Sequence, residues 1–592
     1  MDVASFSVQY KPGMTVQEKL ERLHSSLQNS PFYWKARQLA KEQTMNTGKT
    51  APEEVRQALE DILEASGMKK KLKNLVFNLH GEAKRQVDRT PQAASFTMAV
   101  RPQPSEKAGS TLPRSSGRAT LVVDSSSGTR NNNGSPSISA AAAPAPISLP
   151  LPTVEEPREN INAARRRWER SINEELLAMG SERGRPLARL RADSEAEIEN
   201  KHSHTGLSEG EEPPPLRFLF DSEDLRAVIT MIEPENRSET FAPANQLNSI
   251  KLMLETPTMQ QLQRDFRELS PDFRQVGLDD IIDGMETFVE ERMQLGNKVV
   301  GLGFTPIARQ YSKFGVPTSL RPRLWRLALE LPVEVSVDEQ IHFTWLKSEE
   351  QRMDLITDDL FEMDVQFIAD DDRYFVFEEV LRDAVLAFSR DPWVLHHADL
   401  KAHRPLLGHH GEGQPPGTAL PPCGVQPFRG LCNYVAPVCF LYEDAVPTYF
   451  VARAMWCRFW CRLNAIRGQP NTLLPLCKLF EDLIIQQNPW IFLHLTALGV
   501  QPLSIVMPWI QFGFVGFLEP DQILLLWDRL IGYQSLNLLP VLAAAILIFR
   551  SNSILKAESA EDIKDVFQDI TRLKVVPLLQ TFLFHGSSKG HQ

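Results

Sequence analysis

Apolar residues recur at helical spacing along most of the chain. One side of the segment 377–388 carries Val380, Leu381, Ala384, Val385 and Phe388. The same three- and four-residue spacing returns in 450–466, 473–485 and 522–531. Alternation of apolar and polar residues, which marks a half-buried strand, is scarce. The pattern therefore predicts an all-α protein.

The same pattern divides the chain into segments. We predict an N-terminal helical module over 1–95, in which Thr15 and Glu18 have the spacing of a capping box. A disordered linker is predicted over 96–155, because this Ser-, Gly- and Pro-rich stretch has no Trp, Tyr or Cys to bury. The later segments are an amphipathic helix over 156–190, a polar linker over 191–215 and a helical lead-in over 216–304. The main helical domain is predicted over 305–585 and a tail over 586–592.

The aromatic core is expected in the main domain. Eight of the ten tryptophans lie at or after Trp325, and all six cysteines follow Pro422. The amphipathic helix has its own apolar face, made of Ile161, Ala164, Trp168, Ile172 and Leu176. Arginines crowd the rest of its surface over 165–170. This basic surface is either solvated or contacts an anionic membrane or partner.

Charge and cysteine content exclude several classes of protein. The 592 residues carry 64 basic and 75 acidic side chains, and this net charge of −11 argues against nucleic-acid binding. No cysteine spacing fits a zinc site, so we predict reduced core thiols and no metal. The N-terminus lacks the pattern of a secretory signal, which favours a cytoplasmic location. The uncharged run between His494 and Glu519 contains Pro502 and Pro508, and we interpret it as a buried helical core.

Two polar clusters have alternative interpretations. The stretch 338–383 has 15 acidic and four basic residues, which indicates either a solvated helical face or a docking surface for a basic partner. Histidines also gather beside Asp399, at positions His396, His397, His403, His409 and His410. Their Gly/Pro-rich context favours a mobile loop over a metal site.

Two motifs bracket the main domain. The first is GVPTSLRPRLW, which contains Gly315, Pro317, Arg321 and Trp325. The second is WDR, formed by Trp527, Asp528 and Arg529. We interpret the tryptophans and the charged residues beside them as structural, because an Arg/Asp pair next to buried indole rings is a common packing device.

Two further motifs lie between these. One is ITDD, which ends at Asp359, and the other is FRGLCNYVAP, which begins at Phe428. In their order along the chain, the four motifs resemble those of the TBC domain, the all-helical module of Rab GTPase-activating proteins. The resemblance implies a GTP-bound small GTPase of the Rab family as partner, no cofactor, and a regulator of an enzyme rather than an enzyme. Membrane contact would be indirect or peripheral, on endomembranes.

The resemblance also implies where two functional side chains belong. The family supplies an arginine, which neutralises charge on the transferring phosphoryl group, and a glutamine, which positions the attacking water. Here Glu362 stands at the arginine position and Arg429 at the glutamine position. An arginine donates hydrogen bonds but cannot accept one from water, so Arg429 does not replace an amide. Asp359, Arg429 and Gly430 are the candidate GTPase contacts.

Three hypotheses follow from these substitutions. The chain binds a Rab GTPase with weak or absent acceleration of hydrolysis, or Arg429 acts as a displaced arginine finger. Alternatively, the domain is a helical scaffold whose acidic stretch recruits other proteins. The Gly- and Pro-rich segment 393–428 is an insertion that could cover or redirect the site.

Overall fold

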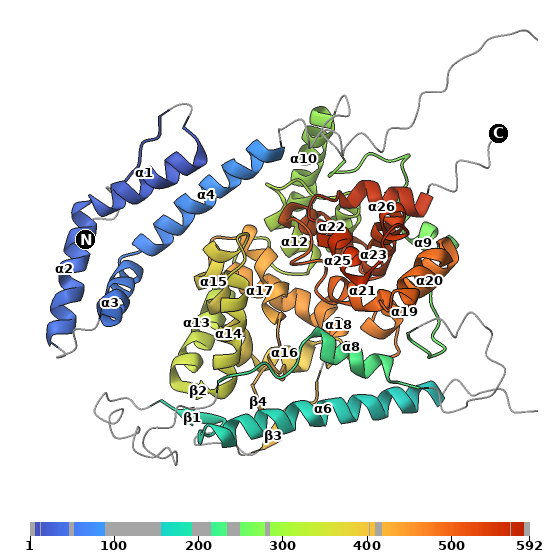
Figure 1. Ribbon diagram of the computed structural model, residues 1–592, viewed down its shortest axis with the longest axis horizontal. Helices are drawn as coiled ribbons and strands as arrows, with labels where there is room; N and C mark the ends of the chain where they lie inside the picture. The colour runs from blue at the N-terminus through green and yellow to red at the C-terminus, as the bar shows by residue number, and fades with distance from the viewer. Residues whose placement is uncertain are drawn as a thin grey trace, which may run out of the picture. The chain divides into compact units, whose positions relative to one another are not determined.

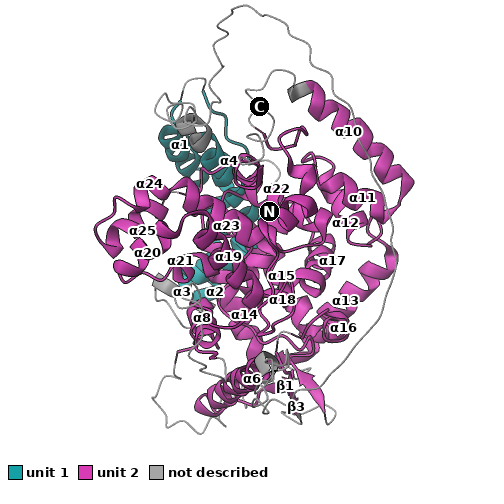
Figure 2. Ribbon diagram, turned by 90° about the vertical axis from the view of Figure 1, so that its right-hand side faces the viewer, with its two compact units in different colours: residues 1–153 teal, residues 154–592 magenta. Residues whose placement is uncertain are grey.

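The computed structural model describes residues 6–11, 14–46, 52–88, 156–191, 215–233, 249–278, 285–401, 403–408, 417–568 and 570–584 (Figure 1). The chain divides into two compact units, 1–153 and 154–592 (Figure 2). The compact unit that contains the main domain therefore starts well before the predicted domain bound at 305.

The first unit is helical. Its helices are α1 (Val16–Gln28), α2 (Pro31–Asn46), α3 (Pro52–Ala65) and α4 (Met68–Asp88). The predicted capping box is confirmed, because the Thr15 hydroxyl accepts the backbone N–H of Glu18 and the Glu18 carboxylate accepts that of Thr15. Its small core is formed by Phe6, Leu23, Phe32, Ala36, Met68 and Leu79.

The second unit is a larger array of helices. Its first half contains α6 (Glu156–Glu182), α8 (Ser222–Thr230), α9 (Met259–Asp265), η4 (Arg267–Leu269), α10 (Met285–Leu302), α11 (Thr305–Ser312), α12 (Arg321–Ala328), α13 (Val337–Arg352), α14 (Ile356–Ala369), η5 (Phe375–Phe377), α15 (Glu378–Arg390) and α16 (Pro392–His397). Its second half contains η6 (Leu431–Tyr434), η7 (Ala436–Phe440), α17 (Ala445–Met455), the π-helical turn η8 (Trp456–Trp460), α18 (Cys461–Leu463), α19 (Leu473–Gln487), α20 (Pro489–Ala497), α21 (Pro502–Gln511), α22 (Pro520–Tyr533), α23 (Leu538–Phe549), α24 (Ser551–Ile554), α25 (Ala560–Gln568) and α26 (Val575–Phe584).

Strands are few and short. β1 (Ala188–Leu190) pairs antiparallel with β2 (Met353–Leu355), and β3 (Leu406–Gly408) pairs antiparallel with β4 (Thr418–Leu420). Both ribbons are seen in Figure 1 as minor additions to the helices. The predicted all-α class is confirmed.

The segment before the main domain belongs to the same core. Along α6 the predicted apolar face is buried, from Ile161 to Leu176. The helix ends at Glu182, earlier than the predicted bound of 190, because the chain turns at Gly184 with φ +58° and then enters β1. Trp168 and Phe220 meet edge to face, so this segment and the later helices share one apolar cluster.

The apolar run interpreted as a buried core lies in α20 and α21. Among the described residues, no single helix is long and apolar enough to cross a membrane. Taken together, α20 and α21 pass that test by length and composition, but they are bent by 112° at their junction. Most of their apolar side chains lie in the core, although Trp490 remains exposed.

A buried carboxylate joins the two motifs that bracket the main domain. Asp528 on α22 accepts hydrogen bonds from Arg321 Nε at 2.9 Å, from Trp325 Nε1 at 2.7 Å and from the Val316 N–H at 3.0 Å. All three donors lie in or beside the first motif. Arg321 and Asp528 are almost fully buried, so each neutralises a charge that the core would otherwise exclude.

The remaining residues of these two motifs surround that carboxylate. Gly315 has φ +84°, and a Cβ there would come within 2.9 Å of the Arg529 side chain, so only glycine fits. Arg529 donates to the carbonyls of Leu525 and Val276 at 2.7 and 2.8 Å. Burial lowers the pKa of Arg529 to about 10. Pro317 accepts the backbone N–H of Arg321 through its carbonyl at 3.1 Å, which starts α12.

We expect Asp528→Asn to lower the free energy of unfolding of the 154–592 unit by about 3–5 kcal/mol, because Arg321 is left buried without its counter-charge. Urea unfolding followed by tryptophan fluorescence measures this, since nine of the ten tryptophans lie in that unit. Asp338→Asn on the exposed start of α13 is the matched control and should change stability by less than about 0.5 kcal/mol. A loss below about 1 kcal/mol for Asp528→Asn would contradict the assignment.

Candidate functional site

Helix α14 carries two of the predicted site residues, Asp359 and Glu362. The helix starts directly after β2, and its first turn is held by Asp358, whose carboxylate accepts the Leu355 N–H at 3.1 Å. Arg390 of α15 donates to both oxygens of Asp358 at 2.7 and 2.6 Å. This bidentate pair is almost fully buried and fixes the start of α14 against α15.

Asp359 is bound by a residue from far upstream. Arg185, in the turn between α6 and β1, donates to Asp359 at 2.7 Å and to Asp354 at 2.6 Å. Arg189 on β1 adds a second hydrogen bond to Asp354 at 2.6 Å. The segment before the main domain therefore neutralises the acidic start of α14.

Glu362 follows Asp359 by one helical turn and is exposed. Its pKa is raised, first by partial desolvation and then by the nearby carboxylates of Asp359, Asp358 and Glu350, while Arg382 opposes the shift. Glu362, at the position where the resemblance implies an arginine, therefore has other acidic residues close by.

A buried carboxylate on the same helix anchors the loop that contains Arg429. Asp364 accepts the backbone N–H of Gly430 at 2.6 Å and that of Cys432 at 2.7 Å. Complete burial raises the pKa of Asp364 to about 6, although the two N–H donors and Arg429 pull it down. The backbone of this loop is therefore fixed to α14 by two charge-assisted hydrogen bonds.

Gly430 is required by the shape of this loop. Its φ is +92°, and a Cβ would come within 2.9 Å of the Phe512 ring and 3.0 Å of the Asn433 amide nitrogen. Any larger residue would be strained and would displace the segment from Asp364.

Arg429 has a fixed backbone and an exposed side chain. Its N–H donates to the Phe220 carbonyl at 3.1 Å, and the Phe220 ring stacks on Phe428 at 4.8 Å. Its guanidinium lies 4.6 Å from the ring centroid of Phe367 on α14. The structure therefore places Arg429 next to the helix that carries Glu362.

Sequence reasoning missed the residues that support these positions. Asp364 is one acidic residue among many in its stretch, and Arg185 and Phe220 lie in segments predicted to be separate. The glutamine nearest to the loop, Gln426, is fully buried and donates to the Leu420 carbonyl at 2.9 Å. Gln426 is therefore not presented at the surface.

The insertion 393–428 is partly integrated into the core. His403 was predicted to lie in a mobile loop, but it is buried against Phe220 and Phe428, and burial lowers its pKa to about 4. His397 stacks on Trp393 with 3.9 Å between ring centroids. His409 and His410 lie outside the described residues. Within the described part of the chain, no group of three His, Cys, Asp or Glu side chains could hold a metal ion.

The structural residues of the two bracketing motifs are buried, unlike the exposed side chains of Glu362 and Arg429. Arg321, Trp325, Trp527, Asp528 and Arg529 are buried in the core network described above. Trp527 lies 6.3 Å from Trp325 between ring centroids and donates to the Gly513 carbonyl at 3.0 Å. They are positioned to support the fold and not to touch a partner.

The sequence comparisons point to one family. Residues 428–555 match the model of the Rab-GTPase-TBC domain. The chain is 35% identical over 443 residues to human TBC1 domain family member 19, and the match covers 73% of this chain and 83% of the relative. Two solved structures are also similar. One is a Chlamydomonas flagellar RabGAP TBC domain, with 14% identity, a TM-score of 0.34 and coverage of 47% of this chain and 83% of that chain. The other is the Ypt/Rab-GAP domain of Gyp1p. It is 16% identical with a TM-score of 0.37, and the match covers 51% of this chain and 99% of that chain.

We expect Asp364→Asn to destabilise the 428–434 loop. An amide has one acceptor oxygen, so the backbone N–H of either Gly430 or Cys432 would then face an NH2 group. The effect should depend on pH. The folded pKa of about 6 lies above the ordinary value of 3.8, so the native state binds the proton more readily than the unfolded state. Stability from this group is therefore greatest at low pH and is lost as the pH rises from about 4 to about 6.

Urea unfolding of both proteins at pH 5 and pH 7 checks this expectation. The stability difference between wild type and Asp364→Asn should be about 1 kcal/mol larger at pH 5 than at pH 7. Comparing the difference rather than either protein alone removes the titration of the other carboxylates. An equal difference at both pH values would show that Asp364 is not the titrating group.

Proposed function

The chain belongs to the TBC-domain family, which gives it a Rab-GAP type role, and we propose that it binds a GTP-loaded Rab GTPase while accelerating hydrolysis weakly or not at all. The binding surface in this proposal is formed by α14 and the 428–434 loop. A Rab partner would give the chain a part in vesicle trafficking. We place it in the cytoplasm and, through its GTPase, on the surface of endomembranes.

The observation that carries the proposal is the exposed carboxylate of Glu362 on α14. At about 4 Å and an effective dielectric constant near 20, a unit charge interacts with a phosphate charge by about 4 kcal/mol, and the sign reverses when a cation becomes an anion. An arginine finger contributes about 10³–10⁵ in rate. A carboxylate at that position opposes the same transition state.

Arg429 supports a second form of the same function. Its guanidinium is exposed beside Phe367, while its backbone is fixed through Phe220 and the adjoining Gly430 is fixed through Asp364. It could therefore supply one cation in trans if the GTPase positions the water with its own glutamine. This displaced-finger alternative predicts activation that depends entirely on Arg429.

The scaffold alternative is less well supported. Many carboxylates of the 338–383 stretch are bound by cations of the chain itself, as with Asp354 and Asp359 to Arg185 and Asp358 to Arg390. Carboxylates already paired in this way offer less charge to a basic partner.

We expect the immobilised full chain to retain one or a few members of a panel of GTP-loaded Rab proteins. Addition of the chain should change the rate of single-turnover phosphate release from the retained member by less than about 10-fold, relative to that member alone. The double substitution Glu362→Arg with Arg429→Gln should raise this rate by at least about 10-fold, because it restores both family groups. Asp338→Asn on the exposed start of α13 changes the net charge by the same +1 as the double substitution and should leave the rate unchanged.

Rapid hydrolysis by the wild-type chain would contradict weak activation. Arg429→Ala would then distinguish a finger from a docking residue, because loss of a finger removes acceleration and leaves retention nearly intact. Arg352→Ala, at an exposed arginine of α13, is the matched control. Absence of any retained Rab protein would overturn the binding proposal itself.

A further inference from the structure

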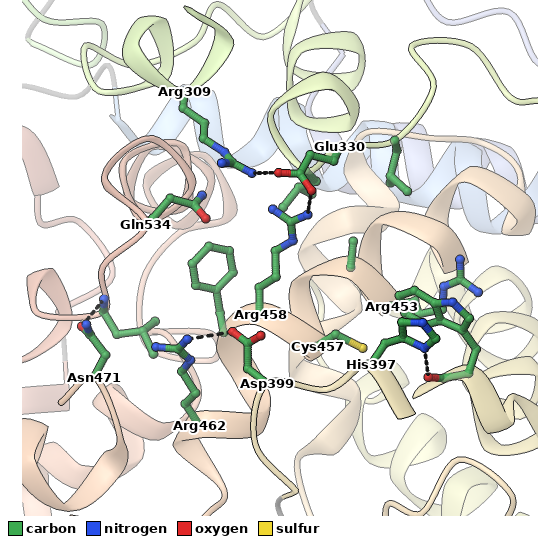
Figure 3. A pocket seen from close by; sticks show the side chains of 16 residues that line it. Arg309, Glu330, His397, Asp399, Arg453, Cys457, Arg458, Arg462, Asn471 and Gln534 are labelled. Carbon is green, nitrogen blue, oxygen red and sulfur yellow. Dashed lines mark hydrogen bonds and ion pairs between the residues drawn. The ribbon is translucent and has the colours of Figure 1, made fainter. Parts of the chain in front are cut away.

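A cavity lined by arginines lies outside the α14 surface. It has a volume of about 590 Å³ and lies among α11, α16, α17, η8, α18 and the end of α22 (Figure 3). None of the residues that line it belongs to α14 or to the 428–434 loop. Its four guanidinium groups are those of Arg309, Arg453, Arg458 and Arg462.

The cavity has more cations than carboxylates. Glu330 accepts hydrogen bonds from Arg309 at 2.6 Å and from Arg458 at 2.7 Å, and Asp399 accepts from Arg462 at 2.7 Å (Figure 3). Arg453 is paired with Asp391, a buried residue that does not line the cavity. Even with Asp391 counted, one guanidinium exceeds the carboxylates.

The guanidinium groups retain donors for a ligand. Arg458 and Arg462 each bind their carboxylate through a terminal nitrogen, whereas a guanidinium has five N–H donors. Arg462 Nε is buried and has no hydrogen-bond partner among the described residues. Because that atom has almost no accessible surface, the donors available to a ligand are the terminal nitrogens that the carboxylates leave without a bond.

Glu330 occupies the position that an anion would take. Its side chain is 55% exposed, yet two guanidiniums converge on it. The pKa of Glu330 is lowered, first by the hydrogen bond from Arg458 and then by that from Arg309. The carboxylate is therefore ionised at neutral pH and acts as an internal competitor for anions.

From this geometry we propose that the cavity binds a small molecule carrying two or more phosphate groups. Phosphate oxygens match the planar fork of arginine, and several phosphates are needed to displace Glu330 and also reach Arg462. The volume lies within the usual range for small-molecule sites. Leu329, Leu331 and Phe459 add an apolar part to the wall, suited to a ring that carries the phosphates. The ligand is a soluble polyphosphate or the phosphorylated headgroup of a lipid.

Titration calorimetry of the full chain with inositol hexakisphosphate tests this site. We expect saturable binding at physiological ionic strength, at which exposed charges are largely screened. Arg458→Gln combined with Arg462→Gln should weaken it at least about 10-fold. Glu330→Gln should strengthen it at least about 3-fold, because the internal competitor is removed. Arg352→Gln, at an exposed arginine outside the cavity, should leave the affinity unchanged.

The opposite effects of the two variants keep the test decisive. Glu330→Gln retains every guanidinium, so its tighter binding is informative even if the double arginine variant fails to fold. Equal affinity of the wild type and all variants for inositol hexakisphosphate would overturn the proposal. Retention of GTP-loaded Rab proteins should be the same for wild type and variants, which separates this site from the proposed GTPase surface.

Vesicles distinguish the two sources of the ligand. Sedimentation with phosphatidylcholine vesicles containing phosphatidylinositol 4,5-bisphosphate should be compared with phosphatidylcholine alone. Sedimentation that is lost with the two arginines assigns the site to a lipid headgroup. Calorimetric binding without sedimentation assigns it to a soluble polyphosphate. Failure of both assays overturns the proposal.

Discussion

The buried ion pair between Asp528 and Arg321 is the interaction on which the candidate site depends. Asp528 binds Arg321, 207 residues earlier, and so joins the two ends of the main domain. The next residue, Trp527, donates to the carbonyl of Gly513, and the adjacent Phe512 packs against Gly430. Disruption of one buried ion pair would therefore propagate through a few packed side chains to the loop that presents Arg429.

A second constraint comes from the segment before the main domain. Arg185 binds the start of α14, while Phe220 stacks on Phe428 and accepts the N–H of Arg429. Both elements of the candidate surface are therefore positioned by residues that precede the matched region 428–555. Arg185 contacts α14 and Phe220 contacts the loop, so these two residues help to set the geometry between them.

The sequence predicts what repeats locally and misses what is joined over long distances. Helical periodicity identifies α6, α15 and α22, and motif spacing proposes Glu362 and Arg429 as candidate site residues. Nothing local distinguishes Asp364, which binds two backbone N–H groups, from the acidic residues around it. Charge counting likewise describes the 338–383 stretch as a uniform anion, although arginines from remote segments neutralise part of it. The mobile-loop prediction was wrong for His403, because the local Gly and Pro content does not show that Phe220 and Phe428 cover this side chain.

Neutralisation of its neighbours concentrates the negative charge of α14 at Glu362. Asp358 and Asp359 are bound by Arg390 and Arg185, whereas Glu362 forms no ion pair with any residue that the structure describes and is affected by the charge of Arg382. A raised pKa makes proton uptake easier, and approach to a phosphate would raise it further. A protonated carboxyl can donate one hydrogen bond to a phosphate oxygen. It still carries no positive charge, so even in that state Glu362 lacks the charge stabilisation that makes an arginine finger effective.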